Sequence, residues 1–257
     1  MTFDEERARR RLFAWLKDTL PWPERIAEIE DIHLQGLAAD LGVTPAQLQT
    51  ILPFVPEESF ANAQIAMDED FLTYHFDGET AIDAYLKAEG HAETDATRAF
   101  LLALRDTPLS LYEVIDVVAD SHWLLRDRLG DTTPVHIGDA WADDCITPDS
   151  TLAARVVAVG DRRFIAEGMI ALPNPVAAVI VDIFESQQAS FDDQFPDIAA
   201  EHGIPLTAET RLRMGRQLLA GVVTGAYFMH LLGNVMSTLG SLETALSGTS
   251  GHSEGSG

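Results

Sequence analysis

The sequence predicts an α+β protein: a helical N-terminal part, a small five-stranded antiparallel β-barrel and a helical C-terminal part. Three observations lead to this prediction. Short runs of β-branched and aromatic residues are confined to residues 110–172. Helical periodicity dominates on both sides. The 257 residues also suffice to bury a core without disulfides. We divide them into 1–107, 108–173 and 174–246, with a disordered Gly/Ser-rich tail at 247–257.

The N-terminal part opens with an amphipathic helix over Phe3–Leu20. Its apolar side chains recur at helical spacing and define one face: Leu12, Phe13, Leu16 and Leu20. Pro21 and Pro23 follow directly, and proline does not continue a helix interior. The helix is therefore expected to end before them.

The clearest motif is a helix-turn-helix arrangement over Leu34–Leu52. A turn separates an apolar first helix from a second helix in which Leu48 and Ile51 face inward. Thr44 is a good N-cap, and Gln47 three residues later predicts a capping box. We interpret the pair as a scaffold or a protein-binding surface, with DNA binding as the alternative.

DNA binding by this pair would need cations nearby. Lysine and arginine contacts to phosphate supply most of the affinity, yet Ile26 to Leu86 contains neither residue type. Gln47, Gln49 and Thr50 have side chains that can read base edges. The acidic residues around them would repel the phosphates, so nucleic acid is not the expected partner.

The same cation-free run supplies the residues that we predict to bind a basic protein partner: Asp68, Glu69, Asp70, Asp77, Glu79 and Asp83. A strongly acidic surface attracts cationic proteins over long range. A stricter version of this hypothesis has the carboxylates lined up on one face, where they would imitate the phosphates of DNA.

Two groups of residues are candidate metal ligands for a hydrolase. The first is His75 with Asp77 and Glu79. The second combines His136 with three aspartates, Asp139, Asp143 and Asp144. Neither group has the spacing of a zinc motif, and the carboxylates would have to converge on metal ions to act. We therefore predict no bound metal and no other cofactor.

Two helices are predicted between the acidic run and the barrel. They cover Thr80–Lys87 and Asp95–Arg105. The second places Phe100, Leu101 and Leu104 on one face, which we expect to be buried.

The barrel is predicted from five short apolar runs without intervening helices. These are Leu111–Val118, His122–Arg128, Pro134–Ile137, Leu152–Val159 and Phe164–Leu172. Gly160-Asp161 is a hairpin signal between the last two. Curling into a barrel would remove the exposed strand edges.

The motif SLYEVIDVVADSHWLLRDRLGD, followed by AARVVAVGD and a last apolar strand, resembles a module of uncharacterised bacterial proteins. Some of these proteins carry a cysteine-rich SEC-C motif. The metal-binding cysteines of that motif are missing here. The resemblance implies a domain boundary and no particular chemistry.

Two helices are predicted after the barrel, over Val176–Phe184 and Asp192–His202. Thr207 caps a third helical stretch, in which Gln217–Leu242 carries no charged residue. We interpret that stretch as core helices, with self-association through Leu218–Leu232 as an alternative. Its polar residues and glycines argue against a membrane span.

A net charge of −24 sets the expected partners, because it repels nucleic acid and anionic membranes. The single cysteine, Cys145, excludes an intramolecular disulfide, and no signal-peptide pattern begins the chain, so we expect a cytoplasmic location. The leading hypothesis is a non-enzymatic adaptor that binds a basic protein, and its stricter version is a DNA mimic. The alternatives are a helix-turn-helix transcriptional regulator and a metal-dependent hydrolase.

Overall fold

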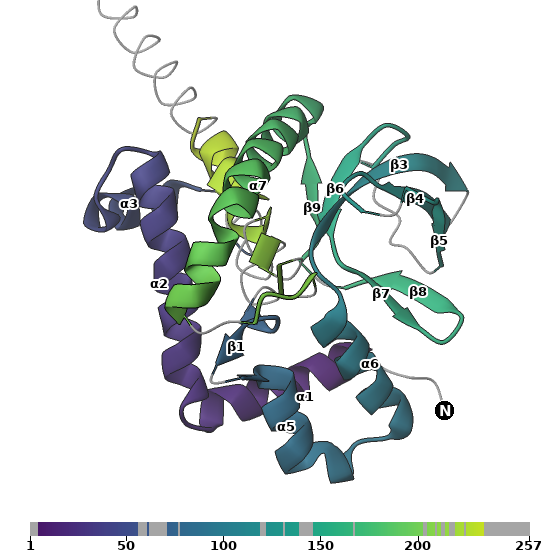
Figure 1. Cartoon of the computed structure of the whole chain (residues 1–257). Coiled ribbons are helices and arrows are strands. Elements are labelled where there is room, and N and C mark those ends of the chain that lie inside the picture. Colours follow the sequence, from purple (N-terminus) through teal and green to yellow (C-terminus); the bar gives the residue numbers. More distant parts are fainter. Residues whose placement is uncertain are drawn as a thin grey trace, which may run out of the picture.

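The computed structural model describes residues 5–55, 61, 71–76, 78–118, 122–130, 132–138, 146–166, 168–202, 205–208, 210–211, 214–215, 219–223 and 225–233. Helices and an antiparallel sheet occur together, which confirms the predicted α+β class (Figure 1). The tail at 247–257, predicted to be disordered, lies outside the described residues.

Helices α1 (Glu5–Asp18), α2 (Trp22–Asp40) and α3 (Pro45–Ile51) and the 3-10 helix η1 (Leu52–Phe54) form the start of the N-terminal part. The amphipathic first helix is confirmed, because Leu12 and Leu16 are fully buried. Leu20 was predicted on the same face, and that prediction is wrong. Helix α1 ends two residues before Leu20, so the helical register no longer applies, and Leu20 is 74% exposed.

A short hairpin of β1 (His75–Phe76) and β2 (Glu79–Thr80) leads into α5 (Ala81–Glu89), the 3-10 helix η2 (Gly90–Ala92) and α6 (Asp95–Asp106). Both predicted helices are confirmed. Phe100, Leu101 and Leu104 are buried in a core that α1, α2, α5 and α6 share. Phe100 also contacts the ring of Phe164 from the β-region, with ring centroids 5.7 Å apart.

The strands are β3 (Ser110–Val118), β4 (His122–Asp127), β5 (Val135–Ile137), β6 (Thr151–Ala154), β7 (Val156–Val159), β8 (Arg162–Ile165) and β9 (Ile170–Leu172). Five form one antiparallel sheet in the order β5-β4-β3-β6-β9, and β7 pairs only with β8 among the described strands. The described strands therefore form an open sheet plus a hairpin, and the expectation of a closed barrel is corrected.

The reason lies at Arg155, which divides the predicted strand Leu152–Val159 into β6 and β7. Its side chain is buried at 3% exposure, and its Nη1 donates a hydrogen bond to the carbonyl of Thr107 at 3.1 Å. The chain leaves the sheet there, and β7 and β8 form a separate hairpin (Figure 1). The predicted turn of this hairpin is confirmed, with Gly160 at φ 61°.

The sheet buries both faces. Leu111 of β3 lies in a cluster with Ile180 of α7 (Asn174–His202) and with Leu219 of the C-terminal helical segment, residues 219–223 and 225–233. Tyr112 of β3 lies in a cluster on the other face, and Val156 of the hairpin packs against that cluster. The sheet is therefore a central layer between helices and the hairpin.

Helix α7 is continuous, whereas the sequence suggested two helices with a break over residues 185–191. Phe184, Phe191 and Phe195 repeat at helical spacing and are buried, so one face continues through the polar stretch. Residues 219–223 and 225–233 are also helical. Among the described helices, none combines the length and apolarity needed to cross a bilayer.

Candidate interaction surfaces

The predicted helix pair is present, and its capping box is confirmed. The Thr44 hydroxyl accepts a hydrogen bond from the Gln47 amide at 3.2 Å, and the Gln47 side-chain oxygen accepts one from the Thr44 amide at 2.9 Å. The Thr50 hydroxyl donates to the Gln47 carbonyl at 2.7 Å. The side chains of Gln47 and Thr50, which were considered for base reading, thus make hydrogen bonds within the helix pair. The third, Gln49, is exposed.

The inner face of the helix pair packs against the C-terminal helical segment. Leu37, Ala38 and Leu48 form a buried cluster with Phe228 and Leu232. The inward direction predicted for Leu48 is therefore correct. This packing ties the helix pair to the C-terminal part of the chain and leaves only its outer face for a partner.

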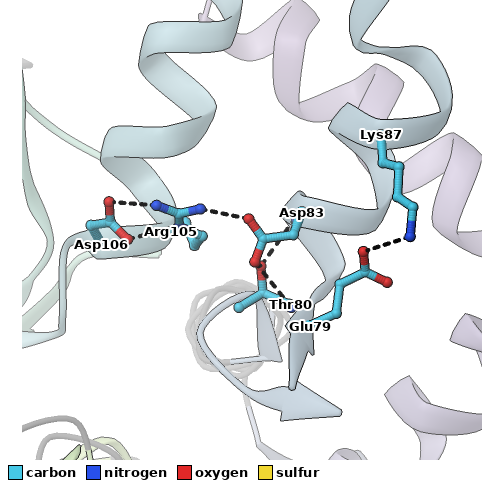
Figure 2. Close-up of polar contacts among 6 residues, drawn as sticks. All are labelled: Glu79, Thr80, Asp83, Lys87, Arg105 and Asp106. Atoms are coloured by element: carbon cyan, nitrogen blue, oxygen red, sulfur yellow. Dashed lines mark hydrogen bonds and ion pairs between the residues drawn. The ribbon is translucent and has the colours of Figure 1, made fainter. Parts of the chain in front are cut away.

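The predicted partner-binding residues divide into two groups. Asp68, Glu69, Asp70 and Asp77 lie outside the described residues. Glu79 and Asp83 are described, and both contact cations (Figure 2). Glu79 lies 3.6 Å from the ammonium of Lys87, and Asp83 lies 2.5 Å from the guanidinium of Arg105.

Asp83 also caps helix α5. Its carboxylate accepts hydrogen bonds from the Thr80 amide at 3.2 Å and the Thr80 hydroxyl at 2.8 Å, and the same hydroxyl accepts from the Asp83 amide at 3.1 Å. Burial raises the pKa of Asp83, but the hydrogen bonds from Arg105 and Thr80 together outweigh it and hold the pKa below its usual value. Asp83 therefore has a clear structural role (Figure 2).

A second acid is neutralised in the N-terminal core. Glu93 is buried, accepts a short hydrogen bond from the Tyr85 hydroxyl and lies 3.2 Å from the Arg11 guanidinium. Burial, followed by the contact with Glu93, raises the pKa of Tyr85. The trio joins α1 to α5 and the turn after it.

Helix α2 carries a different kind of acidic surface, which we call the α2 stripe: Glu24, Glu28 and Asp31. These residues stand four and three positions apart, so they lie on one face of the helix. All three are exposed, and within the described part of the chain none has an ion-pair partner. Asp31 accepts a hydrogen bond from Gln35 at 2.5 Å.

Neither candidate metal group is assembled by the described residues. His75 and Glu79 belong to the short β1–β2 hairpin, but Asp77 between them lies outside the described residues. Four residues of or beside the second group also lie outside the described residues: Asp139, Asp143, Asp144 and Cys145. Over the described ranges, no three His, Cys, Asp or Glu side chains are close enough together to hold a metal ion.

An apolar groove of about 550 Å³ lies between α7 and the C-terminal helical segment. Its lining comes from both helices: Pro175, Val176, Val179, Ile183, Gln187, Val222, Gly225, Ala226, Met229 and His230. The stretch Leu218–Leu232, considered for self-association, is thus divided between core and surface. Leu219 and Phe228 are buried, whereas Met229 is 40% exposed.

Sequence reasoning missed the cations that neutralise α5. Lys87 lies one residue beyond the cation-free run, and Arg105 lies 22 residues from Asp83 in the chain. A local signal did exist for the cap, because Thr80 and Asp83 have the spacing of a capping box. No local signal connected Asp83 to Arg105.

Comparison with known proteins places the chain in a family. Residues 50–194, more than half of the chain, match a family of unknown function (DUF7986). Neither the curated proteins nor the solved structures include a match to this chain. The matched region contains α5, α6, the sheet and the β7–β8 hairpin. This chain therefore belongs to DUF7986, a family of unknown function.

Proposed function

We propose that this protein is a non-enzymatic interaction protein that binds a basic protein partner through the α2 stripe. The observation that carries the proposal is the exposed line of Glu24, Glu28 and Asp31, which have no ion-pair partners within the described residues. The net charge of −24 would speed the approach of a cationic partner.

Charge spacing separates the general proposal from the DNA-mimic version. Glu24 and Asp31 are seven residues apart, which is about 10.5 Å along a helix. Since one DNA strand carries a phosphate per ~3.4 Å of helix axis, a stripe of this length corresponds to only about three phosphates. Imitation of DNA would need further aligned carboxylates, so the stripe favours a shorter basic segment as the partner.

The stripe also suggests the form of that segment. Ile32 stands beside Asp31 on α2 and is 51% exposed. A partner helix with lysine or arginine at i, i+4 and i+7 matches the three carboxylates, and one apolar residue at its edge would cover Ile32.

A binding experiment tests the proposal. The wild-type chain and the variant E24Q/E28Q/D31N are titrated with a fluorescent helical peptide that carries lysines at those spacings, and both are used to capture partners from native lysate. We expect the variant to bind the peptide at least about tenfold more weakly, and wild-type binding to weaken as salt rises.

Glu79→Gln is the matched control, because Glu79 already pairs with Lys87. It should leave peptide binding unchanged. Equal affinities for the wild type and the triple variant, or binding that ignores salt, would contradict the proposal.

The two alternatives remain hypotheses with simple tests. A regulator that uses Leu34–Leu52 should shift duplex DNA at low salt. A metal-dependent hydrolase should retain metal through purification, which elemental analysis detects. Cytoplasmic location and self-association through Leu218–Leu232 are further expectations. Cell fractionation and light scattering test them.

A further inference from the structure

A second site lies away from the acidic helices, between the sheet and the β7–β8 hairpin. It is a cavity of about 400 Å³, within the range usual for small-molecule sites. Its lining comes from β3, β4, the segment 133–136, β7 and β8. Every lining residue falls inside the region 50–194 that matches the family.

Arg163 supplies the cation of this cavity. In the hairpin, Val157 pairs with Phe164, and both side chains join the helical core. Because side chains alternate along a strand, Val156 and Arg163 take the opposite face, and both line the cavity. Within the described residues, Arg163 forms no ion pair.

Asp127 is the carboxylate of the cavity, and one of its oxygens is already occupied. Its Oδ1 accepts hydrogen bonds from the Ser110 hydroxyl at 2.6 Å, the Leu129 amide at 2.9 Å and the Gly130 amide at 3.0 Å. These bonds hold the turn after β4. No ion pair joins Asp127 to Arg163 within the described residues, so the Arg163 guanidinium is available to a ligand.

We propose that this cavity binds a small organic carboxylate with an apolar body, and that Arg163 holds the carboxylate. A guanidinium matches a carboxylate with two parallel hydrogen bonds. Pro134, Val135, Val156 and the ring of Tyr112 form an apolar wall for the rest of the molecule. A phosphate dianion fits less well, because Asp127 and the net charge of −24 repel its second negative charge. Among the described lining residues, Arg163 is the one lysine or arginine, and His136 is the only other side chain that can carry a positive charge.

Ligand-observed NMR on the full chain tests this inference. The probes are benzoate, cinnamate, isovalerate and hexanoate, each paired with its uncharged amide, and inorganic phosphate. We expect at least one carboxylate to bind, and its amide and phosphate to bind at least about tenfold more weakly, because a hydrogen bond to a charged group is lost. Arg163→Gln should weaken carboxylate binding by a similar factor.

Arg162→Gln is the matched control. Arg162 is the preceding residue of β8 and is also exposed, but it lies on the other face of the hairpin and does not line the cavity. The Arg162→Gln variant should bind the carboxylate with the same affinity as the wild type. The inference is overturned if no carboxylate of the panel binds, if the amides bind equally well, or if both arginine variants lose the same affinity. Unchanged melting temperatures of both variants show that they remain folded.

Discussion

Helices α2 and α5 both lie within the acid-rich part of the chain, but their carboxylates have different surroundings. On α5 and the strand before it, Asp83 and Glu79 lie within 2.5 Å and 3.6 Å of cations. On α2, Glu24 and Glu28 are exposed and have no ion pair within the described residues. A high local density of acids therefore does not by itself make an acidic binding surface.

The difference arises from the neighbour that each helix packs against. Helix α5 packs beside α6, whose last turn carries Arg105. Helix α2 packs Trp22 and Ile29 into the same core as α5 and α6, with the α2 stripe left exposed. Its C-terminal end, at Leu37 and Ala38, packs on the segment around Phe228, and the surrounding stretch Gln217–Leu242 has no charged residue. No cation from that neighbour is available to the outer face of α2.

The largest effect is expected from the packing that holds α2 in place. Phe228→Ala removes a fully buried ring that contacts the helix pair, and such changes cost about 3–5 kcal/mol. Urea unfolding measures this loss. Met229→Ala, at a 40% exposed neighbouring position, should cost under ~1 kcal/mol. Equal losses would mean that α2 does not depend on this cluster.

The second-largest loss of stability is expected at Asp83, and Asp106, which contacts the same arginine, provides the exposed comparison. Asp83→Ala removes the capping-box hydrogen bonds that its carboxylate accepts from the Thr80 amide and hydroxyl, worth about 1 kcal/mol, and a partly buried contact to Arg105, for a total of about 2 kcal/mol. Asp106→Ala, which removes the exposed partner of the same arginine, should cost no more than ~0.5 kcal/mol. The midpoints of urea unfolding compare the two, and a reversed order would contradict the role given to Asp83.

Acid should weaken the α5 contacts through Asp83. Its pKa is lower in the folded chain than in the unfolded chain, so its ionised form stabilises the fold above the unfolded value of about 3.9. This contribution is lost as the pH falls through the lowered folded pKa. Unfolding midpoints of the wild type and Asp83→Asn should therefore differ at pH 7, and the difference should shrink as the pH falls below about 4 and close below the lowered folded pKa. A constant difference would exclude this linkage.

The smallest stability effect is expected from the α2 stripe. Neutralising Glu24, Glu28 and Asp31 should change the unfolding free energy by less than ~0.5 kcal/mol, since exposed like charges four residues apart repel weakly. The same variant should lose peptide binding. A large loss of stability would show that the acids of the stripe have a structural role, as Asp83 of α5 does, and would contradict the difference drawn between the two helices.

Much of the local structure was readable from the sequence. The capping box at Thr44, the buried face of α6 and the turn at Gly160 follow from short-range rules, and all are present. The open sheet was not predictable, because the division of Leu152–Val159 depends on a contact between Arg155 and Thr107, 48 residues apart.

The sequence by itself determined the α+β class, most helix positions and the excess of negative charge, because periodicity, caps, turns and composition act over a few residues or over the whole chain. Tertiary structure alone decided which carboxylates are neutralised and that Arg163 faces a cavity. Ion pairs and cavity linings join residues that are distant in the chain, and their partners are set by how helices and strands pack.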